Sequence, residues 1–338
     1  MKTLLQVKDI AVNFHTGTGV FQAVRGNSFT VTEGECLGIV GESGSGKSVT
    51  AMSLLHLLGP TAKITSGEAL FDGQDLLKMN TKQIRAIRGD RISMIFQDPM
   101  SSLNPLIPVG KQVAEMIWSH NRKLPKAEQK RRVLELFEKV HIPEPEKRYN
   151  SYPNQFSGGM RQRVMISMAL ACNPDLLIAD EPTTALDVTI QHQILKLIAG
   201  MRKEAGMSVI FITHDLGVVA ELCTRVIVMY GGLIMEEGPI EKIFASPRHP
   251  YTIGLLESIP SIVQDKARRL NPIPGSPPDM SNPPPGCPFA FRCRWARNIC
   301  SHELPPFTDC GDGQQSRCWM LSPEAPEENN PFQKQVTQ

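Results

Sequence analysis

The chain has 338 residues and a formal net charge of +2, with 36 lysines and arginines against 34 aspartates and glutamates. This near balance argues against a protein that binds nucleic acid through bulk positive charge. At 41% hydrophobic and 21% charged residues the composition is that of a globular protein, and no apolar run reaches the roughly 18 residues of a membrane-spanning helix.

The first third of the chain predicts strands that lead into a glycine-rich loop. Residues 4–14 and 29–31 have the pattern of short strands. Residues 36–40 (CLGIV) form a compact apolar run that predicts a buried strand, and residues 48–58 after the loop alternate in a helical manner. The first residues lack the charged-then-apolar pattern of an export signal, so we expect a protein that is not secreted.

Further buried strands follow, separated by helical stretches. The residue block 98–165 interrupts this alternation, and its polar faces predict a helical insertion. Strands that alternate with helices predict an α/β fold with a mostly parallel sheet. The predicted strands in this part of the chain are residues 91–96, 176–179, 209–212 and 226–229.

The composition changes near Ser246. Residues 247–338 hold 16 of the 27 prolines, including a proline-rich extended segment at 271–288, and five of the eight cysteines lie between residues 287 and 318. Such a change predicts a boundary, with one domain at 1–245 and an extension at 246–338. Five clustered cysteines in a chain without an export signal favour a metal centre over a disulfide framework.

Residues 41–48 (GESGSGKS) match the phosphate-loop pattern GxxxxGK[ST]. Glycines let backbone N–H groups converge on phosphate oxygens, and the helix that follows presents its positive end to the same anion. Lys47 is expected to reach the β- and γ-phosphates, and Ser48 to bind Mg²⁺. The predicted nucleotide-binding residues of this loop are Gly41, Glu42, Ser43, Gly44, Ser45, Gly46, Lys47, Ser48 and Val49.

Carboxylates and other polar side chains follow the later strands. The strand in LLIADE ends in Asp180, placed to hold Mg²⁺, and Glu181, placed to activate the attacking water. Gln97 follows a strand in the same way and could contact both Mg²⁺ and water. His214 also follows a strand, at the end where ligands bind in such sheets, and is expected to contact the γ-phosphate.

These motifs, together with SGGMRQR at 157–163 and Asp187, occur in an order that resembles the ATP-binding-cassette (ABC) ATPases over residues 4–245. The resemblance implies a P-loop fold of the ABC type and a head-to-tail dimer with ATP between the subunits. Ser157, Gly158 and Gly159 would then face the ATP of the other subunit, and Asp187 would communicate across the dimer. Phe14 matches the usual adenine-stacking position, with Phe21 as a rival.

Three segments resemble the dipeptide, oligopeptide and nickel importer subgroup: residues 95–105, 180–191 and 248–256 (RHPYTIGLL). The resemblance implies an ATPase at the cytoplasmic face of the cell membrane that powers peptide uptake. Its partners would be a second, homologous ATPase subunit, two membrane permeases and an extracytoplasmic solute-binding protein. Nickel or another small solute remains an alternative cargo. A DNA-repair or translation ATPase is a distant alternative, because this chain has one phosphate loop and no sustained heptads.

Four cysteines are the predicted metal ligands of the extension: Cys287, Cys293, Cys300 and Cys318. Their loose spacing lacks paired C-x2-C knuckles and suits a cubane iron–sulfur cluster or an irregular zinc site. The subgroup resemblance implies a [4Fe–4S] cluster, with Cys310 as an alternative fourth ligand. The remaining cysteines lie in apolar segments and are expected to be buried core residues: Cys36, Cys172 and Cys223.

Overall fold

The computed structural model describes residues 2–17, 19–184, 186–259, 272–326, 328 and 330–332. Ala185 and residue 271, which belong to segments used above, lie outside the described residues. The chain forms two compact units. Unit 1 comprises Met1–Leu4, Val31–Cys36 and Lys78–Ile212, and unit 2 comprises Leu5–Thr30, Leu37–Leu77 and Thr213–Gln338.

Three parallel strands form the centre of unit 1: β6 (Ile92–Ile95), β7 (Leu176–Asp180) and β8 (Ser208–Thr213). Every residue of β7 and β8 is buried, as expected for strands that are covered on both faces. Ile95 in β6 pairs with Ala179 in β7. The residues after these two strands therefore meet at one edge of the sheet.

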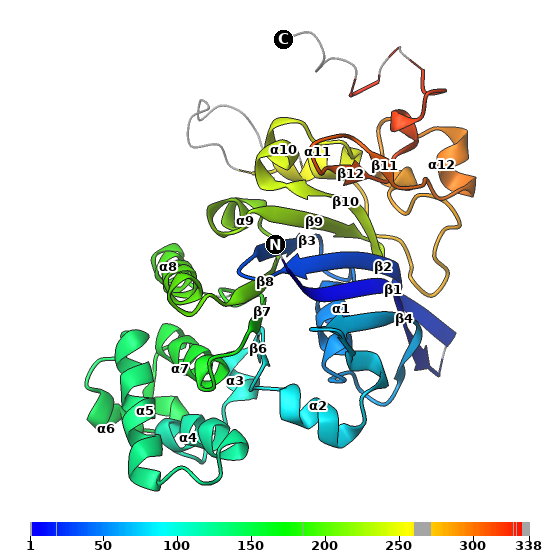
Figure 1. Cartoon of the computed structure of the whole chain (residues 1–338). Helices are drawn as coiled ribbons and strands as arrows, with labels where there is room; N and C mark the ends of the chain where they lie inside the picture. Colours follow the sequence, from blue (N-terminus) through cyan, green and yellow to red (C-terminus); the bar gives the residue numbers. More distant parts are fainter. Residues whose placement is uncertain are drawn as a thin grey trace. The chain divides into compact units, whose positions relative to one another are not determined.

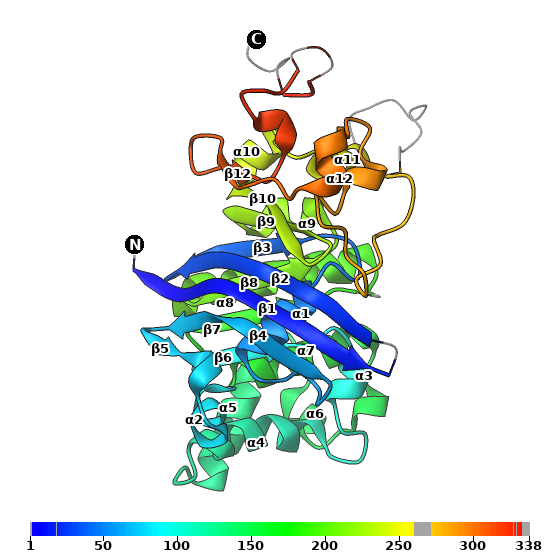
Figure 2. The ribbon, with the colours of Figure 1, turned by 90° about the vertical axis from the view of Figure 1, so that its right-hand side faces the viewer.

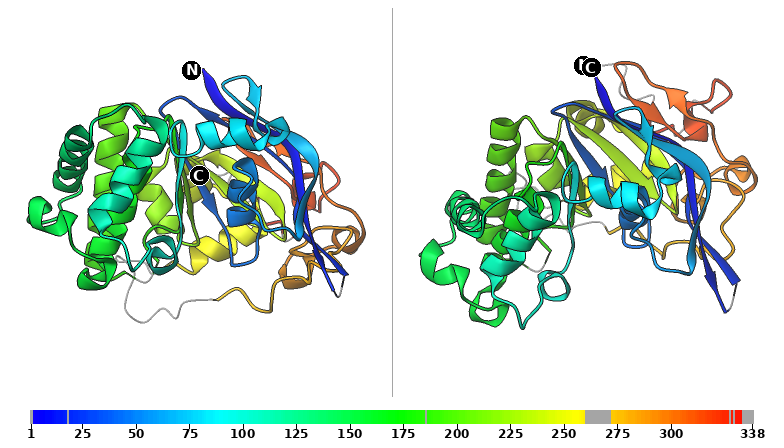
Figure 3. Two further views of the ribbon diagram at one scale, coloured as in Figure 1. Left: turned by 90° about the horizontal axis from the view of Figure 1, so that it is seen from below. Right: turned by 60° about the horizontal axis from the view of Figure 1, so that its bottom comes forward.

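The helices of unit 1 that lie between β6 and β7 gather into one group, which Figure 1 shows in green and Figure 3 shows from below. α5 turns Val133 and Phe137 inward, whereas Arg131 on its outer face pairs with Glu128 and Glu135. The helical pattern of block 98–165 is thus explained by amphipathic helices. The helices of unit 1 are α2 (Thr81–Ile87), α3 (Pro99–Ser102), α4 (Val109–His120), α5 (Lys126–Lys139), α6 (Pro145–Tyr149), η2 (Pro153–Gln155), α7 (Gly158–Leu170) and α8 (Val188–Ala205).

Unit 2 contains a four-stranded sheet in the order β2-β1-β4-β5, visible as long curved strands in Figure 2. β1 pairs antiparallel with β4, with a shift in register between Lys8 and Ala11. The sequence analysis missed β4 (Ala62–Phe71), because none of its first six residues is buried and they show no sustained apolar alternation. The strands of this sheet are β1 (Thr3–Thr16), β2 (Gly19–Thr32), β4 (Ala62–Phe71) and β5 (Gln74–Asp75).

A second set of strands in unit 2 runs in the order β11-β12-β10-β9-β3. β3 (Cys36–Val40) and β9 (Arg225–Tyr230) are parallel, whereas β10 (Leu233–Pro239), β12 (Gln315–Ser316) and β11 (Thr308–Asp309) continue antiparallel. The predicted α/β fold with mostly buried parallel strands is confirmed. The helices of this unit are α1 (Lys47–Leu54), η1 (Leu76–Lys78, where the chain passes to unit 1), α9 (Leu216–Leu222), α10 (Ile240–Ala245), α11 (Pro250–Glu257), η3 (Ala290–Arg292), α12 (Asn298–His302) and η4 (Trp319–Leu321).

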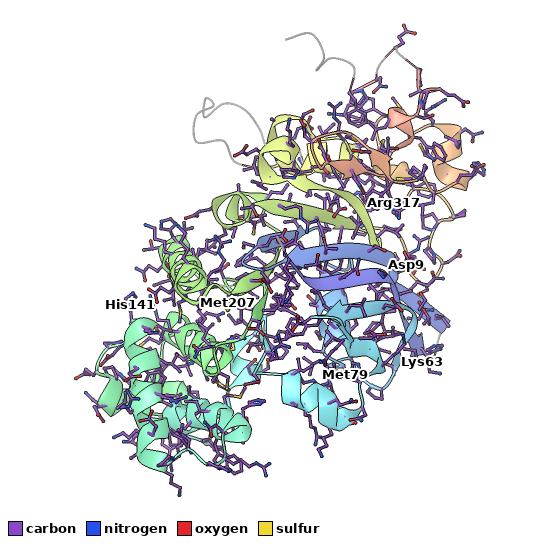
Figure 4. All side chains as sticks on the ribbon, viewed as in Figure 1. Asp9, Lys63, Met79, His141, Met207 and Arg317 are labelled. Carbon is purple, nitrogen blue, oxygen red and sulfur yellow. The ribbon has the colours of Figure 1, made fainter. Side chains whose placement is uncertain are left out.

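The cysteine-rich extension pairs with β10 through its strand β12. The buried carboxylate of Glu236 accepts hydrogen bonds from the Arg248 backbone N–H (2.6 Å) and the Gln314 amide (2.8 Å), and burial raises its pKa to about 7. Arg317, labelled in Figure 4, donates its backbone N–H to the Met235 carbonyl (2.8 Å). The extension therefore shares one compact unit with β9 and β10. The predicted domain boundary at residue 245 stays a prediction.

Candidate functional site: a phosphate loop, a carboxylate cluster and a cysteine cavity

The phosphate loop connects β3 to α1 in unit 2, and two of its glycines have no substitute. Gly41 has φ +156°, and a Cβ there would lie 2.2 Å from the Met229 carbonyl oxygen. Gly46 has φ +97°, and its Cβ would lie 2.5 Å from the Ala23 carbonyl oxygen. Any side chain at these positions would push the loop out of a conformation in which its N–H groups can converge on an anion.

Lys47 is the first residue of α1 and is only 5% exposed. Its Nζ donates hydrogen bonds to the carbonyl oxygens of Gly41 (2.7 Å) and Glu42 (2.9 Å). The Lys47 side chain, at the end of the loop, is thus hydrogen-bonded to the two residues that begin the loop. Ser48 and Val49 continue the first turn, so their N–H groups belong to the positive end of the helix.

The carboxylate cluster lies in unit 1, at the edge where β6 and β7 end. Glu181 Oε2 accepts hydrogen bonds from Gln97 Nε2 (2.9 Å) and Thr184 Oγ1 (2.9 Å). The Glu181 backbone N–H donates to the carbonyl oxygen of Ile212 in β8 (2.9 Å). Glu181 has a φ of 45°, so the chain turns sharply at this residue. Asp180 precedes it as the buried last residue of β7. Gln97 and Glu181 are therefore hydrogen-bonded to each other, and Thr184 is a contact that the sequence analysis missed.

The three residues predicted to face the ATP of the other subunit lie at the start of a helix in unit 1: Ser157, Gly158 and Gly159. Ser157 caps α7, its Oγ accepting the Met160 N–H (3.3 Å). A Cβ on Gly159 would lie 2.8 Å from Ile190 Cγ2 in α8, so a larger residue there would have to displace Ile190. Asp187 caps α8 by accepting the Ile190 N–H (3.0 Å). Ser157 and Asp187 thus start two neighbouring helices with a polar side chain at each N-terminus.

The other predicted nucleotide contacts lie in unit 2. His214 is exposed and directly follows Thr213, the last residue of β8. Phe14 lies in β1 opposite Ala62, whereas Phe21 lines a cavity of about 230 Å³ beside the phosphate loop. The loop itself supplies part of the wall, and so do Tyr230 and Gly231 after β9. The sequence analysis did not predict that the proline-rich segment of the extension approaches the loop, yet this segment lines the cavity with Pro277, Pro278, Asp279 and Met280.

The four predicted cysteine ligands line one small cavity of about 20 Å³ in the extension. The N–H of Cys287 donates to the Cys300 carbonyl (2.8 Å), and a Cβ on Gly286 would lie 2.2 Å from that same oxygen. Gly286 therefore lets these two segments come together. The cysteines that line the cavity are Cys287, Cys293, Cys300 and Cys318.

The chemistry of this cavity is that of buried thiols. Burial raises the pKa of Cys287 to about 12 and that of Cys293 to about 11, and it also raises the pKa of Cys318. Within the described ranges, no three His, Cys, Asp or Glu side chains are arranged to hold a metal ion. Cys310 is not one of the lining residues, and its Sγ contacts the Thr308 carbonyl (3.5 Å) beside the β11–β12 turn.

The other three cysteines lie apart from this cavity. Cys36 and Cys223 are buried, as expected, whereas Cys172 is half-buried, with its Sγ 3.6 Å from the Met116 carbonyl oxygen. The expectation of a fully buried Cys172 is therefore wrong.

A methionine-rich groove of about 400 Å³ lies in unit 1 beside β6 and α3. Its lining includes Phe96, Met116, Met165 and Met168, and flexible methionines suit adaptable contact surfaces.

Across the parts of the chain that the structure describes, no helix has both the length and the apolar character needed to cross a membrane.

Two family models match the sequence. One is described as ABC transporter and matches residues 24–184. The other is described as oligopeptide/dipeptide transporter, C-terminal region, and matches residues 235–300. The first covers the phosphate loop and the carboxylate cluster, and the second begins in β10 and ends at Cys300.

Individual proteins match over nearly the whole chain. An oligopeptide transport ATP-binding protein of Bacillus subtilis is 52% identical, over 97% of this chain and 92% of its own length. A dipeptide transport ATP-binding protein of Lactococcus lactis is 50% identical, over 96% of this chain and 92% of its own length. Among solved structures, the dimeric post-hydrolysis state of the ATP-binding cassette MJ0796 with ADP and Pi matches with a TM-score of 0.63 and 30% identity, covering 70% of this chain and 98% of that one.

Proposed function

This chain belongs to the ABC transporter ATPases, among the ATP-binding subunits of the oligopeptide/dipeptide type, and we propose that it hydrolyses ATP to drive peptide uptake across the cytoplasmic membrane. The observation that carries the peptide cargo is the match of residues 235–300 to the oligopeptide/dipeptide C-terminal region. A complete phosphate loop and the Glu181 cluster in the same chain supply the ATPase chemistry.

The residues divide the work of hydrolysis between them. Lys47 and the loop N–H groups bind the β- and γ-phosphates, and His214 contacts the γ-phosphate. Glu181 accepts the proton of the attacking water, while Gln97 and Thr184 hold its carboxylate in place. Adenine stacks on Phe14 or Phe21. Of these two, Phe21 has the support of lying in a cavity beside the loop.

The side chains predicted to hold Mg²⁺ have the chemistry that suits this ion. The Ser48 hydroxyl, the Gln97 amide oxygen and the buried Asp180 carboxylate are hard oxygen donors, which this ion prefers. When bound, Mg²⁺ would neutralise phosphate charge. Gln97 uses its nitrogen for Glu181, which leaves the oxygen end of the same amide to face the ion.

The subunit would work as half of an ATPase dimer with a second, homologous subunit. Ser157, Gly158 and Gly159 would face the ATP held by that partner, where the start of α7 offers N–H groups and a positive end. Asp187, at the start of α8, would take part in communication between the two subunits of the dimer. ATP favours the closed dimer because only that state completes both phosphate-binding faces.

Two permeases and a solute-binding protein would complete the importer, with this subunit at the cytoplasmic face of the membrane. The region Gln97–Asn104 and the adjoining methionine-rich groove would receive a helix from a permease. The groove supports this assignment because its apolar lining opens beside α3.

The extension would hold a [4Fe–4S] cluster through Cys287, Cys293, Cys300 and Cys318. The support is their common cavity, which excludes Cys310. A single tetrahedral zinc ion would bring its four thiolates to about 3.8 Å from one another. A cubane allows larger distances between the four thiolates, because each thiolate binds a different iron. When bound, the cluster would supply a structural crosslink to a proline-rich segment with few apolar residues.

Replacing Cys293 by serine is expected to remove most of the bound iron and the brown absorbance of the full-length protein purified without oxygen. Cys310→Ser is the matched control, since Cys310 is a tail cysteine outside the cavity, and it should retain both iron and colour. Elemental analysis and absorbance spectra provide the measurement. A wild-type protein that contains zinc and no iron would refute the cluster.

The cargo is tested with the complete transporter in proteoliposomes. We expect ATP-dependent uptake of a labelled dipeptide and a labelled pentapeptide, abolished when this subunit carries Glu181→Gln. Uptake of Ni²⁺ but of neither peptide would replace the peptide proposal by the nickel alternative. ATPase activity stimulated by DNA or ribosomes, without any uptake, would instead point to a non-transport ABC protein.

A further inference from the structure

One residue of the phosphate loop, Glu42, makes three contacts that connect the loop to the extension. Its carbonyl oxygen accepts a hydrogen bond from Lys47 Nζ (2.9 Å). Its backbone N–H donates to the Tyr251 hydroxyl (2.8 Å), and its carboxylate accepts from Arg292 Nη1 (2.7 Å). The same residue thus contacts the phosphate-binding lysine and is held by two side chains from beyond residue 246.

Tyr251 is fixed by the residues directly before it. The His249 ring nitrogen Nδ1 accepts the Tyr251 N–H (3.0 Å) and caps α11, whose first residue is Pro250. Burial lowers the pKa of His249 to about 3, so the ring is neutral and its Nδ1 can accept. Proline at the first helical position adds a preset backbone angle. The His-Pro-Tyr sequence therefore directs one fully buried hydroxyl at the loop.

The Tyr251 ring completes an aromatic cluster. It lies 4.6 Å from the Tyr230 ring and 5.3 Å from the Phe289 ring, measured between centroids. Tyr230 is the last residue of β9, and Phe289 belongs to the cysteine-rich segment. A hydroxyl on a buried ring that packs against two other aromatic rings has little freedom to leave Glu42.

Arg292 is held even more completely. Its side chain is 7% exposed, and its guanidinium donates to the Tyr230 hydroxyl (3.0 Å) and to the carbonyl oxygens of Pro274 (2.8 Å) and Ile273 (3.1 Å), besides Glu42. A guanidinium with this many fixed partners has one orientation. A buried ion pair of this kind gives strong geometric coupling between its two segments.

We propose that Tyr251 and Arg292 are positioning residues for nucleotide binding, which hold Glu42 so that its carbonyl oxygen can position Lys47. The ordering of the cysteine-rich extension and the affinity for ATP are then coupled. By linkage the coupling runs in both directions. Arg292 directly precedes Cys293, so the segment that holds the loop is also the segment that enters the cysteine cavity. This inference rests on the proposed nucleotide site at residues 41–48.

The test is an equilibrium titration of the full-length protein with a fluorescent ATP analogue. Arg292→Gln is expected to weaken nucleotide affinity roughly tenfold, the scale of one lost charge-assisted hydrogen bond. Tyr251→Phe, which removes a single oxygen, should weaken it in the same direction. The KM for ATP should rise while kcat at saturating ATP changes less than about twofold, a split that partial unfolding would not produce.

Arg294→Gln is the matched control. Arg294 also lies in the cysteine-rich segment and also makes an ion pair, to Glu257 at 2.7 Å, but this pair is exposed and does not contact the loop. Its affinity should equal that of the wild type. A double-mutant cycle of Glu42→Gln and Arg292→Gln should be non-additive, since both changes remove the same contact.

Wild-type affinity in both Arg292→Gln and Tyr251→Phe would overturn the proposal, as would additive effects in the cycle. Arg292→Gln also removes hydrogen bonds to the carbonyl oxygens of Ile273 and Pro274, which Tyr251→Phe leaves intact. Tyr251→Phe therefore decides the case in which Arg292→Gln is poorly folded. Failure of the wild type itself to bind the analogue would instead refute the proposed nucleotide site.

Discussion

Replacing Glu181 by glutamine is expected to lower ATP turnover by about 100-fold or more while nucleotide binding persists. Glutamine has the same shape as glutamate but cannot accept the proton of the attacking water, and general-base catalysis contributes roughly 10²- to 10⁴-fold. Gln97 and Thr184 both donate to the Glu181 carboxylate, and the amide oxygen of the variant can still accept one of these bonds. The measurement is phosphate release together with a nucleotide titration.

Glu33→Gln is the matched control, because Glu33 is a surface carboxylate of the same unit that pairs with Lys2 at 3.0 Å. It should leave turnover unchanged. If Glu181→Gln retained wild-type turnover, another group would have to accept the proton. Loss of binding and turnover together would show that Glu181 supports the site and would remove the basis for calling it the base.

The phosphate loop could be predicted because its whole signal is local. The strand before it is apolar at every position, and the glycines and Lys47 follow at fixed offsets. Strand β4 could not be predicted, because it is stabilised by pairing with β1, which lies about 55 residues away in the sequence, and few of its own side chains are buried. Long-range pairing of this kind leaves no period in the sequence.

The cysteine cavity shows the same limit. Composition located the cluster of cysteines, but the choice of Cys318 over Cys310 depends on how the chain folds back on β10. The contact between Glu42 and Arg292 joins residues 250 positions apart, and neither residue type predicts the other. Sequence reasoning thus found the chemical groups of each site and missed the support that the extension gives to the loop.

Replacing Lys47 by alanine is expected to weaken ATP affinity by about 100-fold, since the phosphates lose charge-assisted hydrogen bonds in a buried setting. Lys47 is 5% exposed, and its ammonium donates to the carbonyl oxygens of Gly41 and Glu42, so this charge is fixed at the loop. A nucleotide titration measures the loss, and circular dichroism checks that the variant is folded. Lys8→Ala, which removes an exposed lysine paired with Glu68, should bind ATP like the wild type. Unchanged affinity in Lys47→Ala would remove the phosphate loop from the site and, with it, the premise that Tyr251 and Arg292 act through Glu42.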